Sequence, residues 1–496
     1  MRRGTFRTSR RPEGKTVDRL VLDRGEFRDR VRACWLGKRI GGTLGGPYEG
    51  QLEMHALTYY DPVPEGPAPN DDLDLQLVWL RMLEEEGIDP SVRTFAEYWS
   101  RFAASYPWNE YGAFMRNFAR GLRPPVAGCF ENYFVDEMGS PIRSEIWAVL
   151  HAGDPQSAAR MAWKDSALDH AGGEGTCGEM FWAAVEAAAF VEKNPLTLIR
   201  IGLAMIPLSS LVARAIREAV WCHANGVSWR DARERVVRHF ATSRACAAAP
   251  NHAFTIIGWL YGEDFGERLS KAVNCGYDTD CTGATLGSVL GILEGTAGVP
   301  AAWRDPVGEK IVLHPFTGNC DAPTTLDELT RRTVALAEGA AAGKQDIAFG
   351  EPSRRPEDLP ARLFRNDLAR EALAQDNHMG IELLGGREVR LHYGGEPVLY
   401  PGIGREVRID VEGEAPAEVG LRVPVGWSCE ARGDGRFHVR PDGPVAGRNT
   451  LTVTVGGGTV AFTMLGPSEA KGFAAGENVQ TCPKCRARLE ACICRK

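Results

Sequence analysis

Long apolar runs and an excess of positive charge are both missing from this chain of 496 residues. Without a run of ~18 or more apolar residues, the chain is not expected to span a membrane. The basic stretch Met1–Lys15 lacks the apolar segment that a secretory signal needs. A formal net charge of −7 argues against non-specific binding of nucleic acid. These absences predict a cytoplasmic protein with neither a membrane nor a nucleic-acid partner.

A disulfide framework is missing too, because nine of the thirteen cysteines are scattered between Cys34 and Cys429 without regular spacing. That distribution is typical of reduced thiols. The other four gather near the C-terminus: Cys482, Cys485, Cys492 and Cys494. Four thiolates on short loops suit tetrahedral Zn²⁺, although the second pair has an unusual Cys-x-Cys spacing. A structural zinc site is the first interpretation of this tail, an unliganded reduced tail the second, and a redox role the third.

The chain is long enough for more than one domain, since single cores stop growing near ~250–300 residues. Ala/Leu-rich segments with a helical period extend to about Lys344, whereas period-two alternation between turn residues begins near Gly380. The predicted fold class is an all-α helical bundle followed by a small all-β, sandwich-like C-terminal domain. The predicted boundaries are a disordered basic arm over 1–20, the helical domain over 21–344, a linker with one helix over 345–379, the β domain over 380–467 and the Cys-rich tail over 468–496. The expected strands are Val389–Tyr393, Val407–Val411, Val419–Val423, Phe437–Arg440 and Thr450–Val455.

Two acidic clusters stand far apart in the sequence, each just before an apolar helical run. The first, NDDLD, covers residues 70–74, and the second, DTDC, covers residues 278–281. Carboxylates on helix ends can hold hard divalent cations such as Mg²⁺. Helix capping explains the first cluster equally well, and Asn70 and Asp280 are good N-cap types. Capping has no use for two aspartates two positions apart, so the two clusters together favour a metal site.

Glycine recurs at every fourth position after the second cluster, at Gly283, Gly287, Gly291 and Gly295. Residues at this spacing share one face of a helix. Each glycine costs a helix interior up to about 1 kcal/mol relative to alanine. The spacing therefore predicts a central helix against which another helix packs closely.

Five segments between about residues 30 and 305 form an ordered set of motifs: GGTLGGPYE over 41–49, NDDLD over 70–74, Met138–Trp147, Asp165–Ala184, and GYDTDCTGA over 276–284. The first, second and last are similar to Gly-Asp-Ala-x-Gly-x-x-x-Glu, Thr-Asp-Asp-Thr and Gly-Gly-Asp-Thr-Asp-Thr-x-Gly-Ala. This set and its order resemble the ADP-ribosylglycohydrolase family over one whole domain.

The resemblance implies an all-α catalytic domain around two Mg²⁺ ions, with Mn²⁺ as the alternative. It implies cleavage of the ribose C1″ bond of an ADP-ribosyl or related ribosyl conjugate, either a small molecule or a protein-linked group. Glu49 falls on the glutamate near the scissile bond, where a carboxyl group can transfer a proton. The metal ligands carried over by position are Asn70, Asp71, Asp72, Asp278, Asp280 and Cys281. The residues that fall in the substrate-binding region are Gly139, Ser140 and His170.

Without the resemblance, several residues have plainer interpretations. Glu49 is then a solvated loop acid, and a hydrogen-bonded structural role for His170 is as good as a ligand contact. Arg143 suits anion binding but equally suits a solvated or ion-paired role. Trp79 and Trp182 are expected in the core.

Three positions depart from the family pattern. Asn70 replaces a threonine, Gly42 replaces an aspartate, and Cys281 replaces a threonine with a softer group that suits Mg²⁺ poorly. The departures keep two alternatives open. One is a regulatory module that binds ADP-ribose or another nucleotide without turnover, and the other is a hydrolase of a different N-riboside or small glycoside. The oligomeric state also stays open.

Overall fold

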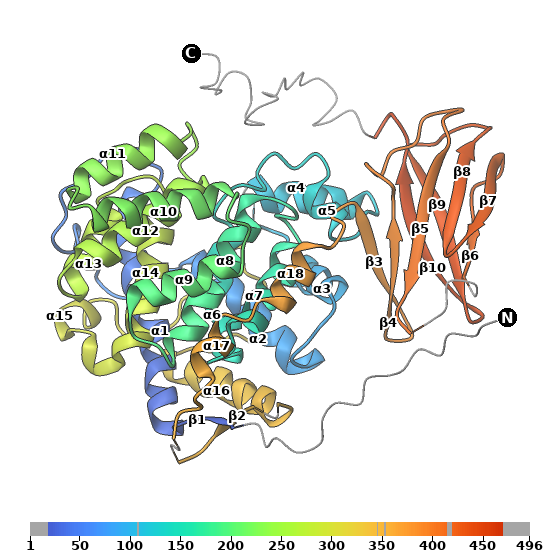
Figure 1. Cartoon of the computed structure of the whole chain (residues 1–496). Helices are drawn as coiled ribbons and strands as arrows, with labels where there is room; N and C mark the ends of the chain where they lie inside the picture. Colours follow the sequence, from blue (N-terminus) through green and yellow to red (C-terminus); the bar gives the residue numbers. More distant parts are fainter. Residues whose placement is uncertain (1–17, 107–108, 345, 352–353, 414–418, 470–496) are drawn as a thin grey trace.

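The computed structural model describes residues 18–106, 109–344, 346–351, 354–413 and 419–469. Its N-terminal part is helical, which confirms the predicted all-α fold (Figure 1). The α-helices of this part are α1 (Arg24–Gly45), α2 (Asp71–Glu86), α3 (Val92–Phe102), α4 (Asn109–Ala119), α5 (Val126–Cys129), α6 (Ser144–Leu150), α7 (Pro155–Ser166), α8 (Glu174–Ala189), α9 (Pro195–Ala204), α10 (Leu211–Ala224), α11 (Trp229–Phe240), α12 (Ala248–Tyr261), α13 (Phe265–Val273), α14 (Thr279–Glu294), α15 (Ala301–Arg304) and α16 (Leu326–Ala342). Short 3₁₀ turns are η1 (Gly46–Tyr48), η2 (Pro141–Arg143) and η3 (Thr296–Gly298). None of the helices within the described ranges has the length and apolar character needed to cross a membrane.

The centre of the helical part is formed by α1 and α14, which pack backbone against backbone. A Cβ atom at Gly41 of α1 would lie 1.9 Å from the carbonyl oxygen of Gly283, and one at Gly287 of α14 would lie 2.0 Å from that of Gly37. Only glycine lets two backbones approach this closely. The close helix contact predicted from the glycine spacing is therefore confirmed.

Large aromatic side chains are buried in the core of the helical part. Trp35 of α1 is fully buried, and so are Trp79, Trp99, Trp147 and Trp182. The prediction that Trp79 and Trp182 belong to the core is confirmed.

The C-terminal part consists of two antiparallel sheets, which confirms the predicted all-β region (Figure 1). The strand order is β3-β4-β5-β8-β7 in one sheet and β10-β9-β6 in the other. The strands are β3 (Met379–Leu384), β4 (Arg387–His392), β5 (Arg405–Val411), β6 (Val419–Arg422), β7 (Trp427–Gly433), β8 (Arg436–Pro441), β9 (Arg448–Val455) and β10 (Gly458–Leu465). Alternate residues of both sheets are buried, as Leu391, Val439 and Leu451 show.

Three of these strands, β3, β7 and β10, were not predicted from the sequence. Each pairs with a predicted strand across a two-residue turn: Gly385-Gly386, Asp434-Gly435 and Gly456-Gly457. All six turn residues have a positive φ, as type I′ hairpin turns require. The turn residues were a stronger signal for these strands than the alternation of their own side chains.

Several contacts join the two parts of the chain. The strand β1 (Leu20–Leu22) pairs in parallel with β2 (Ile347–Phe349), so Leu20, expected in the basic arm, belongs to a strand. The connecting segment holds two short helices, α17 (Leu359–Leu363) and α18 (Asp367–Leu373), where one was expected. Glu382 of β3 accepts a hydrogen bond from Arg93 of α3 at 2.8 Å and also pairs with Arg123. The predicted Cys-rich zinc tail lies outside the described residues.

Candidate metal centre

Two helix starts meet at one end of the α1–α14 pair. The Oγ1 of Thr279, the first residue of α14, donates a hydrogen bond of 2.8 Å to the carbonyl oxygen of Gly45 in α1. This contact places the end of α1, and the η1 turn after it, beside the second acidic cluster. The start of α2 reaches the same place, because Oδ1 of Asp72 lies 3.6 Å from Sγ of Cys281. The two acidic clusters are therefore in contact across the fold.

The centre contains two groups of side chains that could hold a metal ion. Ligand atoms of Asp72, Asp280 and Cys281 all lie within 4.8 Å of one another, and we call this group the Asp72 cluster. Ligand atoms of Glu49, Cys246 and Asp278 also lie within 4.8 Å of one another, and we call this group the Asp278 cluster. Each cluster contains one thiol beside carboxylates.

The side chains of the two N-cap residues at these helix starts do not act as caps. Asn70 and Asp278 are the N-cap residues of α2 and α14, but neither side chain accepts a hydrogen bond from its own helix within the described structure. By contrast, the side chains of Asp23 and Ser91 do cap α1 and α3. N-capping therefore does not explain Asn70, whose side-chain oxygen is left for another partner.

Buried oxygens converge on the centre without hydrogen-bond partners among the described residues. They are Oδ1 of Asn70, Oδ2 of Asp72, Oδ1 of Asp278 and Oδ1 of Asp280. An unpaired buried polar atom costs about 1–3 kcal/mol, and more when it is charged. Carboxylate and amide oxygens are the ligands that hard divalent cations prefer. The residues present therefore fit a divalent metal.

Burial and repulsion between the carboxylates raise their pKa values. The charge of Asp280, followed by burial and the charge of Asp71, raises the pKa of Glu49 to about 8. Burial and the charge of Asp280 raise the pKa of Asp71 to about 6. Burial also raises the pKa of Asp72 and of Asp278 well above the usual range. A bound cation would lower these pKa values because it favours the charged carboxylates.

The backbone of Tyr277 holds Glu49 at the edge of the centre. The N–H of Gly50 donates to the carbonyl oxygen of Tyr277 at 2.9 Å, and the N–H of Tyr277 donates to that of Gln51 at 2.7 Å. Tyr277 has a φ of 71°, a left-handed conformation that costs a non-glycine residue about 1–2 kcal/mol. Its ring packs on Phe254, with 5.4 Å between ring centroids. The loop that carries Glu49 is thus fixed to the residue just before Asp278.

Two of the departures from the family pattern lie against each other. A Cβ atom at Gly42 would lie 2.0 Å from Nδ2 of Asn70. A larger residue at position 42 would therefore displace the amide of Asn70. The glycine and the asparagine form a matched pair.

A buried lysine lies behind the Asp72 cluster. Nζ of Lys38 is 4.0 Å from Oδ2 of Asp72 and 2.8 Å from Oε1 of Glu145. Burial alone lowers the pKa of Lys38, but the charges of Glu145 and Asp72 raise it above its usual value. Ser288 of α14 donates a further hydrogen bond to Glu145 at 2.9 Å. The lysine therefore stays charged and offsets part of the negative charge of the centre.

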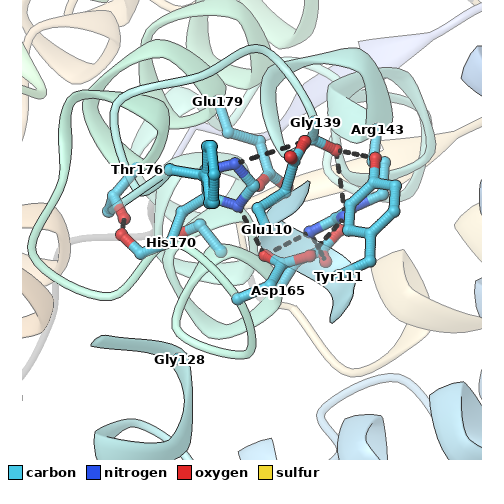
Figure 2. A network of polar contacts seen from close by, with 12 residues as sticks. Glu110, Tyr111, Gly128, Gly139, Arg143, Asp165, His170, Thr176 and Glu179 are labelled. Carbon is cyan, nitrogen blue, oxygen red and sulfur yellow. Dashed lines mark hydrogen bonds and ion pairs between the residues drawn. The ribbon is translucent and has the colours of Figure 1, made fainter. Parts of the chain in front are cut away.

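The predicted substrate-binding residues belong to a neighbouring buried network, with Arg143 and Tyr111 on one side and His170 on the other (Figure 2). Arg143 pairs with Asp165 at 2.8 Å and with Asp169 at 2.9 Å. Nδ1 of His170 lies 2.7 Å from Oδ1 of Asp169. Although burial opposes ionisation, Arg143 and His170 lower the pKa of Asp169 to about 2. Arg143 is thus ion-paired. The sequence had equally allowed an anion-binding or a solvated role.

Glu110 of α4 connects this network to the Asp278 cluster. Oε1 of Glu110 lies 3.9 Å from Nε2 of His170. The same oxygen would lie 1.9 Å from a Cβ atom at Gly139, so the glycine makes room for the carboxyl group. The charge of Asp278, burial, and then the charges of Glu137 and Glu110 raise the pKa of the Cys246 thiol. The predicted substrate region and the acidic centre are adjacent, because Glu137, two residues before Gly139, forms an antiparallel bridge with Ala247, the neighbour of Cys246.

The structure brings the residues predicted from the sequence into two adjoining places. Five of them lie in the two clusters, and Asn70 and Asp71 border these clusters at the start of α2. Gly139, Ser140 and His170 lie in the network around Arg143, where all three are buried.

Sequence reasoning missed Cys246 and Lys38. Cys246 lies in the loop before α12 and belongs to no motif, so only the folded chain shows its place beside Asp278. Lys38 did leave a signal, because it and Arg39 are charged residues between the apolar Leu36 and the glycines at 41 and 42.

The fold and the centre define a class of protein: an all-α domain in which distant helix starts converge on a carboxylate-rich candidate metal site. A family model described as ADP-ribosylglycohydrolase matches residues 23–343. The chain therefore belongs to the ADP-ribosylglycohydrolase family, and this membership supports a glycohydrolase-like role. The matched residues end before β3, so the two C-terminal sheets lie outside the family domain.

Two known proteins are similar to this chain. An uncharacterised protein of Archaeoglobus fulgidus is 26% identical over 324 residues, covering 62% of this chain and 99% of that protein. A solved structure described as an ADP-ribosylglycohydrolase-related protein complex covers 63% of this chain and 99% of its own chain, with 19% identity and a TM-score of 0.43.

Proposed function

We propose that this protein is a Mg²⁺-dependent glycohydrolase, with Mn²⁺ as the alternative metal. It cleaves the ribose C1″ bond of an ADP-ribosyl or related ribosyl conjugate. The observation that supports this most is the meeting of the two acidic helix starts, where Asp72, Asp280 and Cys281 lie within 4.8 Å of one another. Family membership supports the reaction class.

Different residues of the chain have different proposed roles in this reaction. Asn70, Asp71, Asp72, Asp278 and Asp280 would hold the ions, with Cys281 at their edge. Bound ions supply Lewis-acid stabilisation and orient the ribose and the attacking water. Lys38 limits the repulsion between the carboxylates and opposes the rise that burial causes in the pKa of Asp72.

Glu49 is the proposed proton-transfer group. It is exposed at the edge of the centre, where a substrate oxygen can approach it. Its pKa of about 8 without metal would fall toward neutrality next to bound cations, since an opposite charge favours the carboxylate. General acid–base catalysis is most efficient when the pKa lies near the working pH.

The substrate would extend from the acidic centre toward the Arg143 network. Nε2 of His170 and Oγ of Ser140 are both buried without a hydrogen-bond partner in the described part of the chain. Such atoms suit contacts with the polar groups of an ADP-ribosyl substrate, with Gly139 leaving room beside them. Arg143 positions His170 through Asp169 and does not itself reach the substrate.

The test is release of ADP-ribose from ADP-ribosylated arginine, serine and small-molecule conjugates. Glu49→Gln should lower kcat by about 10²–10⁴-fold, the usual range for loss of a general acid or base, while ADP-ribose still binds. Asp280→Asn should remove both turnover and metal-dependent binding. Glu53→Gln, an exposed acid of the same loop, is the matched control and should match the wild type. Unchanged turnover in both site variants would reject the proposal, and tight binding without turnover would favour a regulatory module.

A further inference from the structure

We propose that the Asp278 cluster is a binding site for a thiophilic divalent cation such as Zn²⁺, and that a cation bound there inhibits the hydrolase by capturing Glu49. The inhibitory part rests on the proposed function, whereas the binding site itself does not. The cluster joins residues from three separate segments: Glu49 after η1, Cys246 in the loop before α12, and Asp278 at the start of α14.

The geometry of the cluster is close to that of a metal site. Its three ligand atoms lie within 4.8 Å of one another. Zinc bound tetrahedrally, with Zn–S of about 2.3 Å and Zn–O of about 2.1 Å, holds sulfur and oxygen about 3.6 Å apart. The atoms must therefore approach by at most roughly 1.4 Å, and the exposed Glu49 side chain can rotate toward the other two ligands. A water molecule would take the fourth position.

An unsatisfied oxygen points to a ligand at this place. Asp278 is only 1% exposed, yet its Oδ1 has no hydrogen-bond partner among the residues that the structure describes. Its side chain does not cap α14 either. A buried carboxylate oxygen without a partner is costly unless a cation or a donor binds it.

The fold holds Cys246 beside Asp278 through one buried side chain. Nδ2 of Asn251 donates to the carbonyl oxygens of Ala245 and Ala247, at 2.7 and 2.9 Å. Oδ1 of Asn251 accepts a hydrogen bond of 3.1 Å from the backbone N–H of Asp278. The residues on both sides of Cys246 are thus tied to the start of α14, so the thiol has a defined place in the cluster.

The chemistry of the donors separates the two clusters. Mg²⁺ prefers oxygen ligands, whereas one thiolate with two carboxylates suits Zn²⁺ or Cd²⁺. Cys281 of the Asp72 cluster already donates a hydrogen bond to Asp72 at 3.6 Å, and Lys38 supplies a positive charge there. Cys246 is half-buried and forms no disulfide. The Asp278 cluster is therefore the site for a thiophilic ion, which would bind with release of the thiol proton to solvent.

Occupation of the site would stop proton transfer. A Glu49 carboxylate bound to a cation can neither donate nor accept a proton at the reacting oxygen. Asp278, a proposed ligand of the catalytic ions, would be withdrawn by the same event.

The experiment uses Cd²⁺ as the probe, because a cadmium–thiolate bond gives an ultraviolet charge-transfer band that needs no turnover. The full chain is used with the four tail cysteines, which lie outside the described residues, replaced by serine so that only the cysteines of the described part are titrated. Cd²⁺ is added in excess Mg²⁺ to this protein and to its Cys246→Ser, Cys246→Ala and Cys429→Ser variants. Cys429 is a half-buried cysteine on β7 and serves as the matched control.

One equivalent of Cd²⁺ should produce the band in the parent and in Cys429→Ser, and both Cys246 variants should bind at least about tenfold more weakly. A band that survives in both Cys246 variants, or no band in the parent, overturns the site. Zn²⁺ should inhibit hydrolysis by the parent but not by Cys246→Ser. If the band depends on Cys246 while hydrolysis is insensitive to Zn²⁺, the inhibition is wrong. Absence of any hydrolysis would count against the proposed function and leave the absorbance result to decide the site.

Discussion

The contact between α1 and α14 can be tested by adding a single methyl group. Gly41→Ala would place a Cβ atom 1.9 Å from the carbonyl oxygen of Gly283 and 2.2 Å from its carbonyl carbon. Ordinary contacts begin at about 3.5 Å, so the helices would have to separate by roughly 1.5 Å. Both atoms belong to the backbone and cannot rotate away.

The expected cost follows from this geometry. Overpacking a core typically costs 1–3 kcal/mol, and a clash with rigid backbone should lie at the top of that range, at about 3 kcal/mol. Gly339 of α16 is the matched control because it is exposed, lies in a helix, and has nothing within 4 Å of an added Cβ atom. Gly339→Ala should stabilise by about 0.5–1 kcal/mol, since alanine favours helices.

Urea unfolding of both variants, followed by circular dichroism, measures these changes. Gly41→Ala should also weaken binding of divalent cations, because α14 carries Asp280 into the centre, whereas Gly339→Ala should leave binding unchanged. If Gly41→Ala unfolds at the same urea concentration as the wild type, the backbone contact is not as close as the structure indicates.

Three further predictions concern the polar interior. Arg143→Met removes the guanidinium that pairs with two buried aspartates, so the free energy of unfolding measured in urea should fall by about 3–5 kcal/mol; a loss smaller than 1 kcal/mol would contradict the ion-paired role. Gly42→Asp alone should lower the free energy of unfolding by about 1–3 kcal/mol, because the new side chain clashes with the Asn70 amide. The double variant Gly42→Asp, Asn70→Thr should lose less stability than Gly42→Asp alone. Additive losses of stability in the same urea assay would contradict the matched pair. The pKa of Asp71 is raised to about 6 without metal, and protons compete with the ion for its carboxylate. Between about pH 7.5 and pH 5.5 the ionised fraction of Asp71 drops from about 0.97 to about 0.24. Protonation of Asp71 alone should therefore lower the Mg²⁺ affinity roughly fourfold. Equal affinities at the two pH values, measured by calorimetry, would contradict a ligand role for Asp71.

Local patterns predicted the elements that position the centre. The four-residue glycine spacing of α14 identified a helix that needs close packing, and its partner α1 has glycines at positions 37, 41 and 45 against it. The two acidic motifs marked helix starts, and the structure places both at one end of this pair. These features were readable because each depends on residues close together in the sequence.

Features that depend on tertiary contacts were out of reach. Cys246 reaches Asp278 only because Asn251 ties two separate segments together. Asn70 and Gly42 looked like independent departures, and only the folded chain shows that one side chain fills the space left by the other.

In the β region the missed information was local. The hairpin turns at Gly385-Gly386, Asp434-Gly435 and Gly456-Gly457 have the glycine-rich composition that two-residue turns require. The strands on the far side of each turn were missed although these turns mark where they begin or end.

The most direct test of the central claim is calorimetric titration of ADP-ribose into the whole protein, first with Mg²⁺ and then with excess chelator, in parallel with the Asp280→Asn variant. If the two acidic helix starts form a metal centre that binds the ribose, heat of binding should appear with Mg²⁺ and disappear with chelator and in the variant. Equal binding with and without metal, or no binding in any condition, would contradict the metal-centred account.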